Sequence, residues 1–150
     1  MSDDATSDDA QAADIPSLDA RIAAFLDGDS FAVVGASTDR SKYGNKVLRC
    51  YMQNQREVYP INPSADEVEG LKAYRDLAAL PTRVHGVSII TPPPVTEKIV
   101  EACGKLNIKH LWMQPGAQSD RAIERARELG MNVIGGDACV LVVLGYSEQA

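Results

Sequence analysis

Short apolar segments alternate along the chain with segments in which apolar residues recur at helical spacing. The apolar segments end at Gly, Pro or Asn and are rich in Val and Ile, as strands buried on both faces are. We predict strands at residues 31–34, 57–61, 86–90, 110–113 and 132–134. Helices are predicted at residues 17–26, 42–53, 95–106 and 119–129. Residues 70–80 are predicted to hold a turn and one short helix, and the apolar run 139–144 fits either a strand or a helix.

This alternation predicts the fold class. Strands that alternate with helices form a parallel sheet covered on both faces. We therefore expect a three-layer, doubly wound, Rossmann-like α/β domain with the strand order 3-2-1-4-5 and a switch point between strands one and four. Residues 15–150 are expected to form this single domain. Residues 1–14 are mostly Asp, Ser and Ala, which predicts a disordered acidic tail.

Composition narrows the classes of function. The net charge of −6 at pH 7 argues against a broad nucleic-acid-binding surface. Neither a membrane-spanning run nor the apolar core of a signal peptide is present in the sequence. The three cysteines Cys50, Cys103 and Cys139 form no C-x-x-C pair, so a zinc ribbon or a thioredoxin-like site is not expected. We expect a cytoplasmic protein without nucleic-acid or membrane partners, and a homodimer or an unknown protein partner stays open.

Candidate chemistry is sought at the carboxyl ends of the strands, where open α/β sheets bind ligands. The loops at these ends are Gly35-Ala36-Ser37-Thr38, Asn62-Pro63, Thr91-Pro92-Pro93, Gln114-Pro115-Gly116 and Gly135-Gly136-Asp137. The first four contain no Asp, Glu, His or Cys. This composition indicates binding by shape and hydrogen bonds, with little capacity for acid–base catalysis.

The loop after the first strand predicts a phosphate cradle. Its small residues let the backbone approach a phosphate closely, and the following helix directs free N–H groups toward it. Hydroxyl and cationic side chains are supplied by Ser37, Thr38, Arg40, Ser41, Lys42 and Lys46. The dinucleotide fingerprint G-x-G-x-x-G is absent, because Ser37 and Arg40 occupy two of its small-residue positions. An ordinary tight turn with a solvated basic edge fits this loop equally well.

The end of the second strand argues against NAD. Domains that bind NAD usually place Asp or Glu about twenty residues beyond the fingerprint, to bind the ribose hydroxyls. The chain has Asn62-Pro63 at this strand end. An NAD(P)- or other adenine-nucleotide-binding oxidoreductase subunit or sensor is therefore kept only as an alternative.

Several strand-end motifs together resemble a known family. They are V-V-G-A-S, K-Y-G-N-K-V, Y-P-I-N-P, S-I-I-T-P-P-P-V-T-E-K-I-V, W-M-Q-P-G and G-G-D-A-C, in this order from Val33 onward. The chain resembles the small stand-alone CoA-binding domain proteins, whose domain is similar to the N-terminal CoA-binding domain of the succinyl-CoA synthetase α subunit. The resemblance covers roughly residues 17–145.

The resemblance implies a Rossmann-like fold that binds coenzyme A or an acyl-CoA. The residues implied to hold and flank the CoA phosphates are Gly35, Ala36, Ser37, Thr38, Arg40, Lys42, Tyr43 and Gly44. Asn62 and Pro63 are implied to border the nucleotide. Thr91, Pro92 and Pro93 are implied to line the nucleotide or the pantetheine. Gln114, Pro115 and Gly116 are implied to close the pocket on the pantetheine side.

Catalysis is the less favoured expectation. The synthetase domain that carries a phosphorylated histidine has no counterpart in this sequence, so the resemblance implies binding and not acyl-CoA synthesis. His85 and His110 are predicted to lie at the end of the sheet opposite the ligand. An enzyme that uses Cys139 or Asp137 near the last strand end is a further alternative, although no histidine is predicted beside them.

Overall fold

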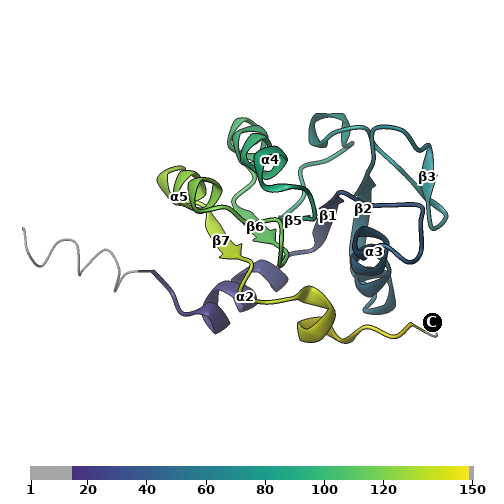
Figure 1. Ribbon diagram of the computed structural model, residues 1–150, viewed down its shortest axis with the longest axis horizontal. Coiled ribbons are helices and arrows are strands. Elements are labelled where there is room, and N and C mark those ends of the chain that lie inside the picture. Colours follow the sequence, from purple (N-terminus) through teal and green to yellow (C-terminus); the bar gives the residue numbers. More distant parts are fainter. Residues whose placement is uncertain (1–14, 149–150) are drawn as a thin grey trace, which may run out of the picture.

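The computed structural model describes residues 15–148 of the protein. Its centre is a sheet of five parallel strands with helices on both faces (Figure 1). This arrangement confirms the three-layer, Rossmann-like α/β class. The predicted acidic tail at residues 1–14 lies outside the described residues.

The predicted strands and helices are present, and each end lies within two residues of its predicted position. The strands of the main sheet are β1 (Ser30–Val34), β2 (Glu57–Ile61), β5 (Gly86–Ile89), β6 (His110–Met113) and β7 (Asn132–Gly135). The α-helices are α2 (Leu18–Leu26), α3 (Tyr43–Gln53), α4 (Pro93–Lys105) and α5 (Asp120–Glu128).

Two segments that the sequence left uncertain form short elements. Between β2 and β5 the chain makes an antiparallel hairpin, β3 (Glu67–Val68) with β4 (Leu71–Lys72), and a 3-10 helix, η1 (Leu77–Ala79). The last apolar run forms a short π-helical segment, η2 (Leu141–Gly145).

The expected strand order needs one correction. The observed order is β2-β1-β5-β6-β7, so the third strand in sequence lies beside β1 and not beyond β2. The free edge of β2 is covered by residue 74: the Tyr74 N–H donates to the Pro60 carbonyl, and the Asn62 N–H donates to the Tyr74 carbonyl. Pro60 also lacks an N–H for another strand, as is typical of edge strands. The switch point therefore falls between β1 and β5.

The two layers around the sheet follow from the alternation along the strands. In β1, Phe31 and Val33 pack toward α2, α3 and η2, whereas Ala32 and Val34 pack toward α4, α5 and η1. Figure 1 shows these groups of helices on opposite sides of the strands. Because both faces of β1 are buried, the four residues that follow Ser30 are all apolar, without polar alternation.

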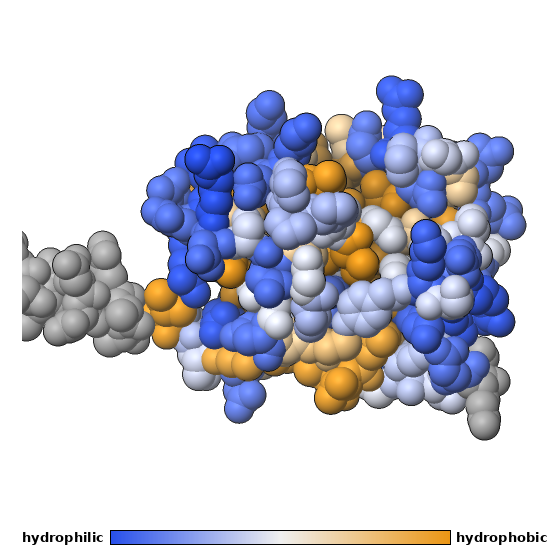
Figure 2. All heavy atoms as spheres, in the orientation of Figure 1, coloured by the Kyte–Doolittle hydropathy of each residue, from blue (hydrophilic) through white to orange (hydrophobic). Residues whose placement is uncertain are grey.

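The surface carries few exposed large apolar side chains. Two of them, Val142 and Val143, lie in η2. Figure 2 shows apolar side chains gathered along the lower edge of the visible face, over η2 and α2. Within residues 15–148, no helix is long and apolar enough to cross a membrane.

Candidate functional site: a cradle and a groove at the strand ends

The carboxyl ends of β1 and β5 meet at the switch point. The Ile90 N–H donates to the Val34 carbonyl at 2.8 Å and joins the two strand ends. A cavity of about 410 Å³ opens there. Its lining residues are Gly35, Ala36, Ser37, Lys42, Tyr43, Gly44, Asn62 and Ile90. The structure thus brings together seven of the predicted site residues, and we call this cavity the cradle.

Two glycines let α3 approach the end of β1. Gly35 has φ +97°, and a Cβ on it would lie 2.0 Å from the Ile90 carbonyl oxygen. A Cβ on Gly44 would lie 1.9 Å from the Gly35 carbonyl oxygen. Because α3 begins at Tyr43, its unpaired first N–H groups lie at the cradle, where an anion is favoured.

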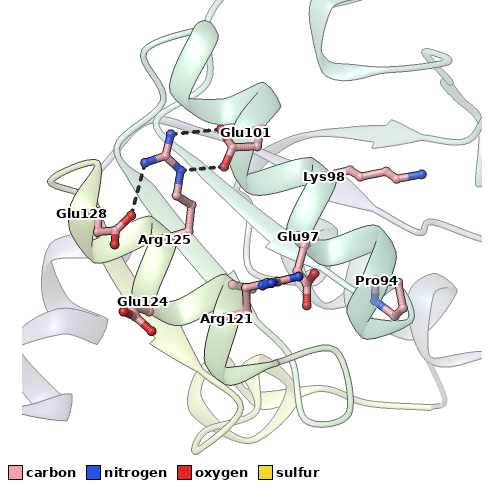
Figure 3. A pocket seen from close by; sticks show the side chains of 9 residues that line it. Pro94, Glu97, Lys98, Glu101, Arg121, Glu124, Arg125 and Glu128 are labelled. Atoms are coloured by element: carbon pink, nitrogen blue, oxygen red, sulfur yellow. Dashed lines mark hydrogen bonds and ion pairs between the residues drawn. The ribbon is translucent and has the colours of Figure 1, made fainter.

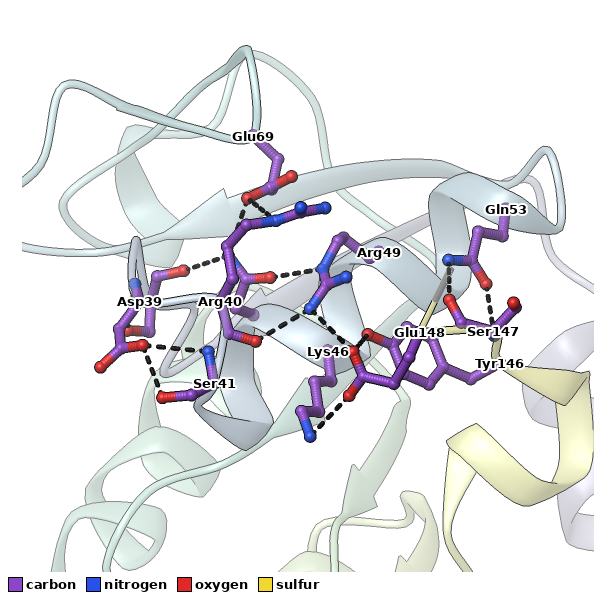
Figure 4. Close-up of polar contacts among 12 residues, drawn as sticks. Asp39, Arg40, Ser41, Lys46, Arg49, Gln53, Glu69, Tyr146, Ser147 and Glu148 are labelled. Carbon is purple, nitrogen blue, oxygen red and sulfur yellow. Dashed lines mark hydrogen bonds and ion pairs between the residues drawn. The ribbon is translucent and has the colours of Figure 1, made fainter. Parts of the chain in front are cut away.

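The hydroxyls of the loop are used to hold its own shape. Ser37 Oγ accepts a hydrogen bond from the Asp39 N–H at 3.0 Å. The Asp39 carboxylate accepts bonds from the N–H and the hydroxyl of Ser41 at 2.9 and 2.6 Å (Figure 4). These bonds from Ser41 lower the pKa of Asp39. The hydroxyls of Ser37 and Ser41, two of the three predicted donors, therefore form bonds within the loop.

Asn45 is a buried residue of the site that the sequence reasoning missed. Its Nδ2 donates to the Ser37 carbonyl at 2.8 Å and to Glu69 Oε2 at 3.0 Å. Its Oδ1 accepts from Arg49 Nε at 2.6 Å, and Arg49 Nη2 donates to the Arg40 carbonyl at 2.9 Å. Asn45 thereby ties the cradle loop to α3 and to the β3–β4 hairpin. The available signal was a pair of polar residues, Asn45 and Arg49, four apart on a largely buried helix.

The predicted cations are distributed unequally. Lys42 lines the cradle. Arg40 turns toward the hairpin, where its Nε lies 3.3 Å from Glu69 Oε2. Lys46 Nζ lies 2.7 Å from Glu148 Oε1, in the C-terminal segment that crosses α3 (Figure 4). Lys42 is thus the predicted cation that the structure places at the cradle.

At the end of β2, the Asn62 side chain holds two loops together through hydrogen bonds. The Asn62 Nδ2 donates to the Ala36 carbonyl at 3.0 Å. Its Oδ1 accepts from the N–H groups of Ser64 and Ala65 at 2.8 and 3.0 Å. The Asn62 side chain therefore fixes the floor of the cradle, and Pro63 lines the neighbouring groove.

An apolar groove of about 680 Å³ adjoins the cradle and shares Gly35 with it. It lies between α4 and η1, because a 3-10 helix stands where a longer crossover helix would cover the sheet. Its side chains include Ile61, Leu77, Val95, Ile99, Leu106 and the predicted residues Pro63 and Thr91. Pro92 and Pro93 form the N-cap and first turn of α4, beside this groove.

The fourth strand end is placed differently from the cradle. Gln114 is fully buried, and its Oε1 accepts from the Val140 N–H at 3.0 Å and from the Tyr43 hydroxyl at 3.3 Å. Its Nε2 has no hydrogen-bond partner among residues 15–148. Pro115 and Gly116 lie in an exposed turn. Gln114 therefore lies behind Tyr43 and does not line the cradle.

Tyr43 connects the cradle to a cysteine. Its hydroxyl lies 2.5 Å from Cys139 Sγ. Burial, followed by the hydrogen bond with Cys139, raises the pKa of Tyr43, so the hydroxyl keeps its proton at neutral pH. Cys139 is partly exposed, whereas Cys50 and Cys103 are buried.

A further hollow of about 680 Å³ lies between α4 and α5 and is lined mostly by charged side chains. Arg125 reaches Glu101 at 2.7 Å and Glu128 at 3.2 Å (Figure 3). Exposed pairs of this kind contribute about 0–1 kcal/mol. The Ser119 hydroxyl donates to Glu97. Because this hollow is lined by residues of α4 and α5 and by none of the loops at the strand ends, we do not regard it as the site.

Comparison with known proteins gives a consistent result. A family model described as the CoA binding domain matches residues 29–145. The α subunit of an ADP-forming acetate–CoA ligase II from Pyrococcus furiosus is 30% identical over 122 residues, which cover 74% of this chain and 27% of that relative. The chain thus spans about a quarter of the length of that ligase subunit.

Shorter proteins match over most of their length. The uncharacterized protein YneT of Bacillus subtilis is 26% identical over 111 residues, with coverage of 74% of this chain and 82% of that protein. The structure of a conserved hypothetical protein from Pyrococcus furiosus superposes with a TM-score of 0.72 at 35% identity. It covers 76% of this chain and 97% of that chain.

Proposed function

Because this chain belongs to the CoA-binding domain family, we propose that it binds coenzyme A or an acyl-CoA at the cradle and groove, and that it catalyses no reaction there. The observation that carries the proposal is the adjacency of the two features at one switch point. A backbone cradle at the start of α3 suits a phosphate, and an apolar groove beside it suits a flat base.

In this arrangement the pyrophosphate lies on the first turn of α3. Lys42 supplies the countercharge, and the glycines Gly35 and Gly44 keep side-chain atoms away from the phosphate oxygens. The adenosine lies in the groove against Pro63 and Thr91. The pantetheine arm then leaves the cradle past Tyr43.

The lack of carboxylates and histidines in the lining of the cradle supports binding without catalysis. Its eight lining residues include no Asp, Glu or His. His85 and His110 lie at the amino ends of β5 and β6, as predicted. Among residues 15–148, no group of three or more His, Cys, Asp or Glu side chains is arranged for a metal. The cytoplasmic location expected from the sequence stays a prediction.

Calorimetry on ligand-free protein tests the proposal. We expect heat on titration with CoA and much weaker binding of NADH, which shares the adenosine and pyrophosphate but lacks the pantetheine arm. If millimolar CoA gives no heat and no thermal shift, the proposal is wrong. Tighter binding of NADH than of CoA would favour the oxidoreductase or sensor alternative.

A matched pair of lysine variants tests the placement of the phosphates. Lys42→Glu puts a negative charge at the cradle and is expected to raise the Kd for CoA about tenfold or more, a loss of about 1.4 kcal/mol. Lys98→Glu makes the same change in the hollow between α4 and α5 and should leave the Kd unchanged. Equal effects of the two variants would show a nonspecific charge effect.

A further inference from the structure

We propose that Cys139 is a covalent attachment site for coenzyme A, which it takes up from a disulfide of CoA as a mixed disulfide. The proposal rests on the proposed function, since CoA held in the cradle must present its sulfur to this thiol. It concerns a thiol that the binding proposal does not use.

The position of Cys139 relative to the cradle is the first argument. Tyr43 lines the cradle, and its hydroxyl lies 2.5 Å from Cys139 Sγ. The thiol is therefore one tyrosine side chain away from the place proposed for the phosphates. The pantetheine arm is longer than a tyrosine side chain and ends in the sulfur, so CoA anchored by its phosphates can reach this thiol.

The contrast among the three cysteines is the second argument. Cys50 and Cys103 are fully buried, and burial raises their pKa to about 11 and about 12. Both thiols are thus held in the unreactive protonated form. Cys139 is partly exposed, so among the three it is the one that a solvent-borne disulfide can approach.

A buried amide beside Tyr43 is the third and independent argument. Gln114 is fully buried, and its Oε1 accepts from the Val140 N–H and the Tyr43 hydroxyl. A flipped amide would set Nε2 against the Val140 N–H, so the orientation is fixed. Within residues 15–148 its Nε2 has no partner, and unpartnered buried donors are rare in native proteins. We infer that the acceptor arrives with a ligand, and the pantetheine arm carries two amide carbonyls.

The proposed step is a thiol–disulfide exchange. The Cys139 thiol first gives its proton to solvent, and the thiolate then attacks one sulfur of CoA disulfide. The new sulfur–sulfur bond forms as the bond between the two CoA sulfurs breaks, and the departing CoA thiolate takes up a proton. CoA disulfide is the oxidant, and one CoA is released in reduced form. The Tyr43 hydroxyl, which donates to Gln114 Oε1 while Cys139 is a thiol, turns its one proton to the thiolate and stabilises it.

Mass spectrometry with peptide mapping tests the attachment. Reduced, ligand-free protein is treated in parallel with CoA disulfide and with glutathione disulfide. We expect one CoA per chain on Cys139, formed at least tenfold faster than the glutathione adduct. Cys139→Ala should abolish the adduct, and Cys103→Ala should form it at the wild-type rate. Tyr43→Phe keeps the ring at the cradle and should lower the rate of adduct formation equally for the two disulfides.

Three results would overturn the attachment site: no adduct, an adduct on Cys50 or Cys103, or equal rates with the two disulfides. Calorimetry with CoA in the presence of a reductant measures reversible binding separately. Reversible binding without a selective adduct rejects the attachment site and leaves the proposed function intact. Absence of reversible binding rejects the proposed function, and with it the step that depends on the cradle.

Discussion

The two ends of the central sheet are built from different kinds of residue. At the carboxyl end, glycines and apolar side chains form most of the cradle and the groove, and the charged residues that line them are Lys42, Arg75, Asp76 and Lys105. At the amino end, the rings of His85 and His110 stack at 4.1 Å beside a polar hollow of about 460 Å³. That hollow is lined by Asp27, Asp29, Arg83 and Lys109 among others. Both histidines of the chain thus lie at the end where an open α/β sheet does not bind its ligands.

This difference shows that a cluster of titratable side chains does not by itself identify the ligand-binding site. The histidines of the amino end have structural partners: His85 Nε2 contacts the Ala24 carbonyl at 3.0 Å, and Asn132 lies 3.1 Å from His110 Nδ1. The cavities at the carboxyl end are lined by no histidine, but the backbone there leaves a cavity at the start of a helix. Four substitutions test whether the two ends are independent in this way.

The largest effect is expected at the glycine contact of the carboxyl end. Gly44→Ala places a Cβ 1.9 Å from the Gly35 carbonyl oxygen, which is backbone and cannot move aside. We expect a loss of about 3 kcal/mol in the free energy of unfolding, measured by urea denaturation. Gly104→Ala is the control, because its Cβ meets the flexible end of Leu129 at 3.1 Å. Equal stability of the two variants would contradict the close packing of α3 on β1.

The second effect concerns the buried amide that holds the cradle loop. Asn45→Ala removes the bonds to Ser37 and Glu69 and leaves Arg49 Nε without its partner. We expect a loss of about 2–3 kcal/mol in unfolding free energy, together with weaker CoA binding by calorimetry. Arg40→Ala removes the other partner of Glu69, but the Arg40 side chain is 59% exposed, so its stability cost should stay below about 1 kcal/mol. The reverse ranking would mean that the loop is held mainly by the surface ion pair.

The third effect tests the groove without disturbing the fold. Val95→Glu places a carboxylate at the mouth of the groove and should raise the Kd for CoA about tenfold, or about 1.4 kcal/mol. Val142→Glu changes an apolar side chain that is 81% exposed in η2 and should leave binding unchanged. If calorimetry shows that Val95→Glu binds CoA with wild-type affinity, the adenosine does not lie in the groove.

The smallest effect concerns the amino end. Burial, and then the charge of His85, lower the pKa of His110 in the folded protein. As the pH falls through about 6.5, His110 takes up a proton in the unfolded chain but not yet in the folded protein. The free energy of unfolding therefore decreases until the pH reaches the lowered pKa of folded His110. We expect a shallow fall in Tm between pH 7.5 and 5.5, reduced in His110→Gln.

Saturating CoA serves as the control for this fourth prediction. If the ends of the sheet are independent, CoA should raise Tm without changing the difference in pH dependence between the wild type and His110→Gln. A Tm that increases as the pH falls, or a pH dependence of His110 that disappears with CoA, would contradict the separation of the two ends.

Sequence patterns predicted the elements well because the signals are local. Apolar runs that end at Gly, Pro or Asn located the strands, and periodicity located the helices. The strand order was less accessible, although Pro60 held a usable signal, since a proline inside a strand favours an edge position. The sequence did not show that Tyr74 pairs with the outer edge of β2, because this contact joins segments that are separate in the chain.

The site shows the same division. The sequence by itself determined the loops at the strand ends, their small residues and the lack of Asp, Glu, His and Cys in the first four of them, because parallel strands bring their carboxyl ends to one edge. Only the tertiary structure decided which polar side chains remain at the cradle. Arg40 forms an ion pair with Glu69, and Asn62 donates to the Ala36 carbonyl. Gln114 is buried behind Tyr43. These partners come from other elements, so hydrogen-bond geometry in three dimensions, and not residue type, assigns each side chain to the ligand or to the fold.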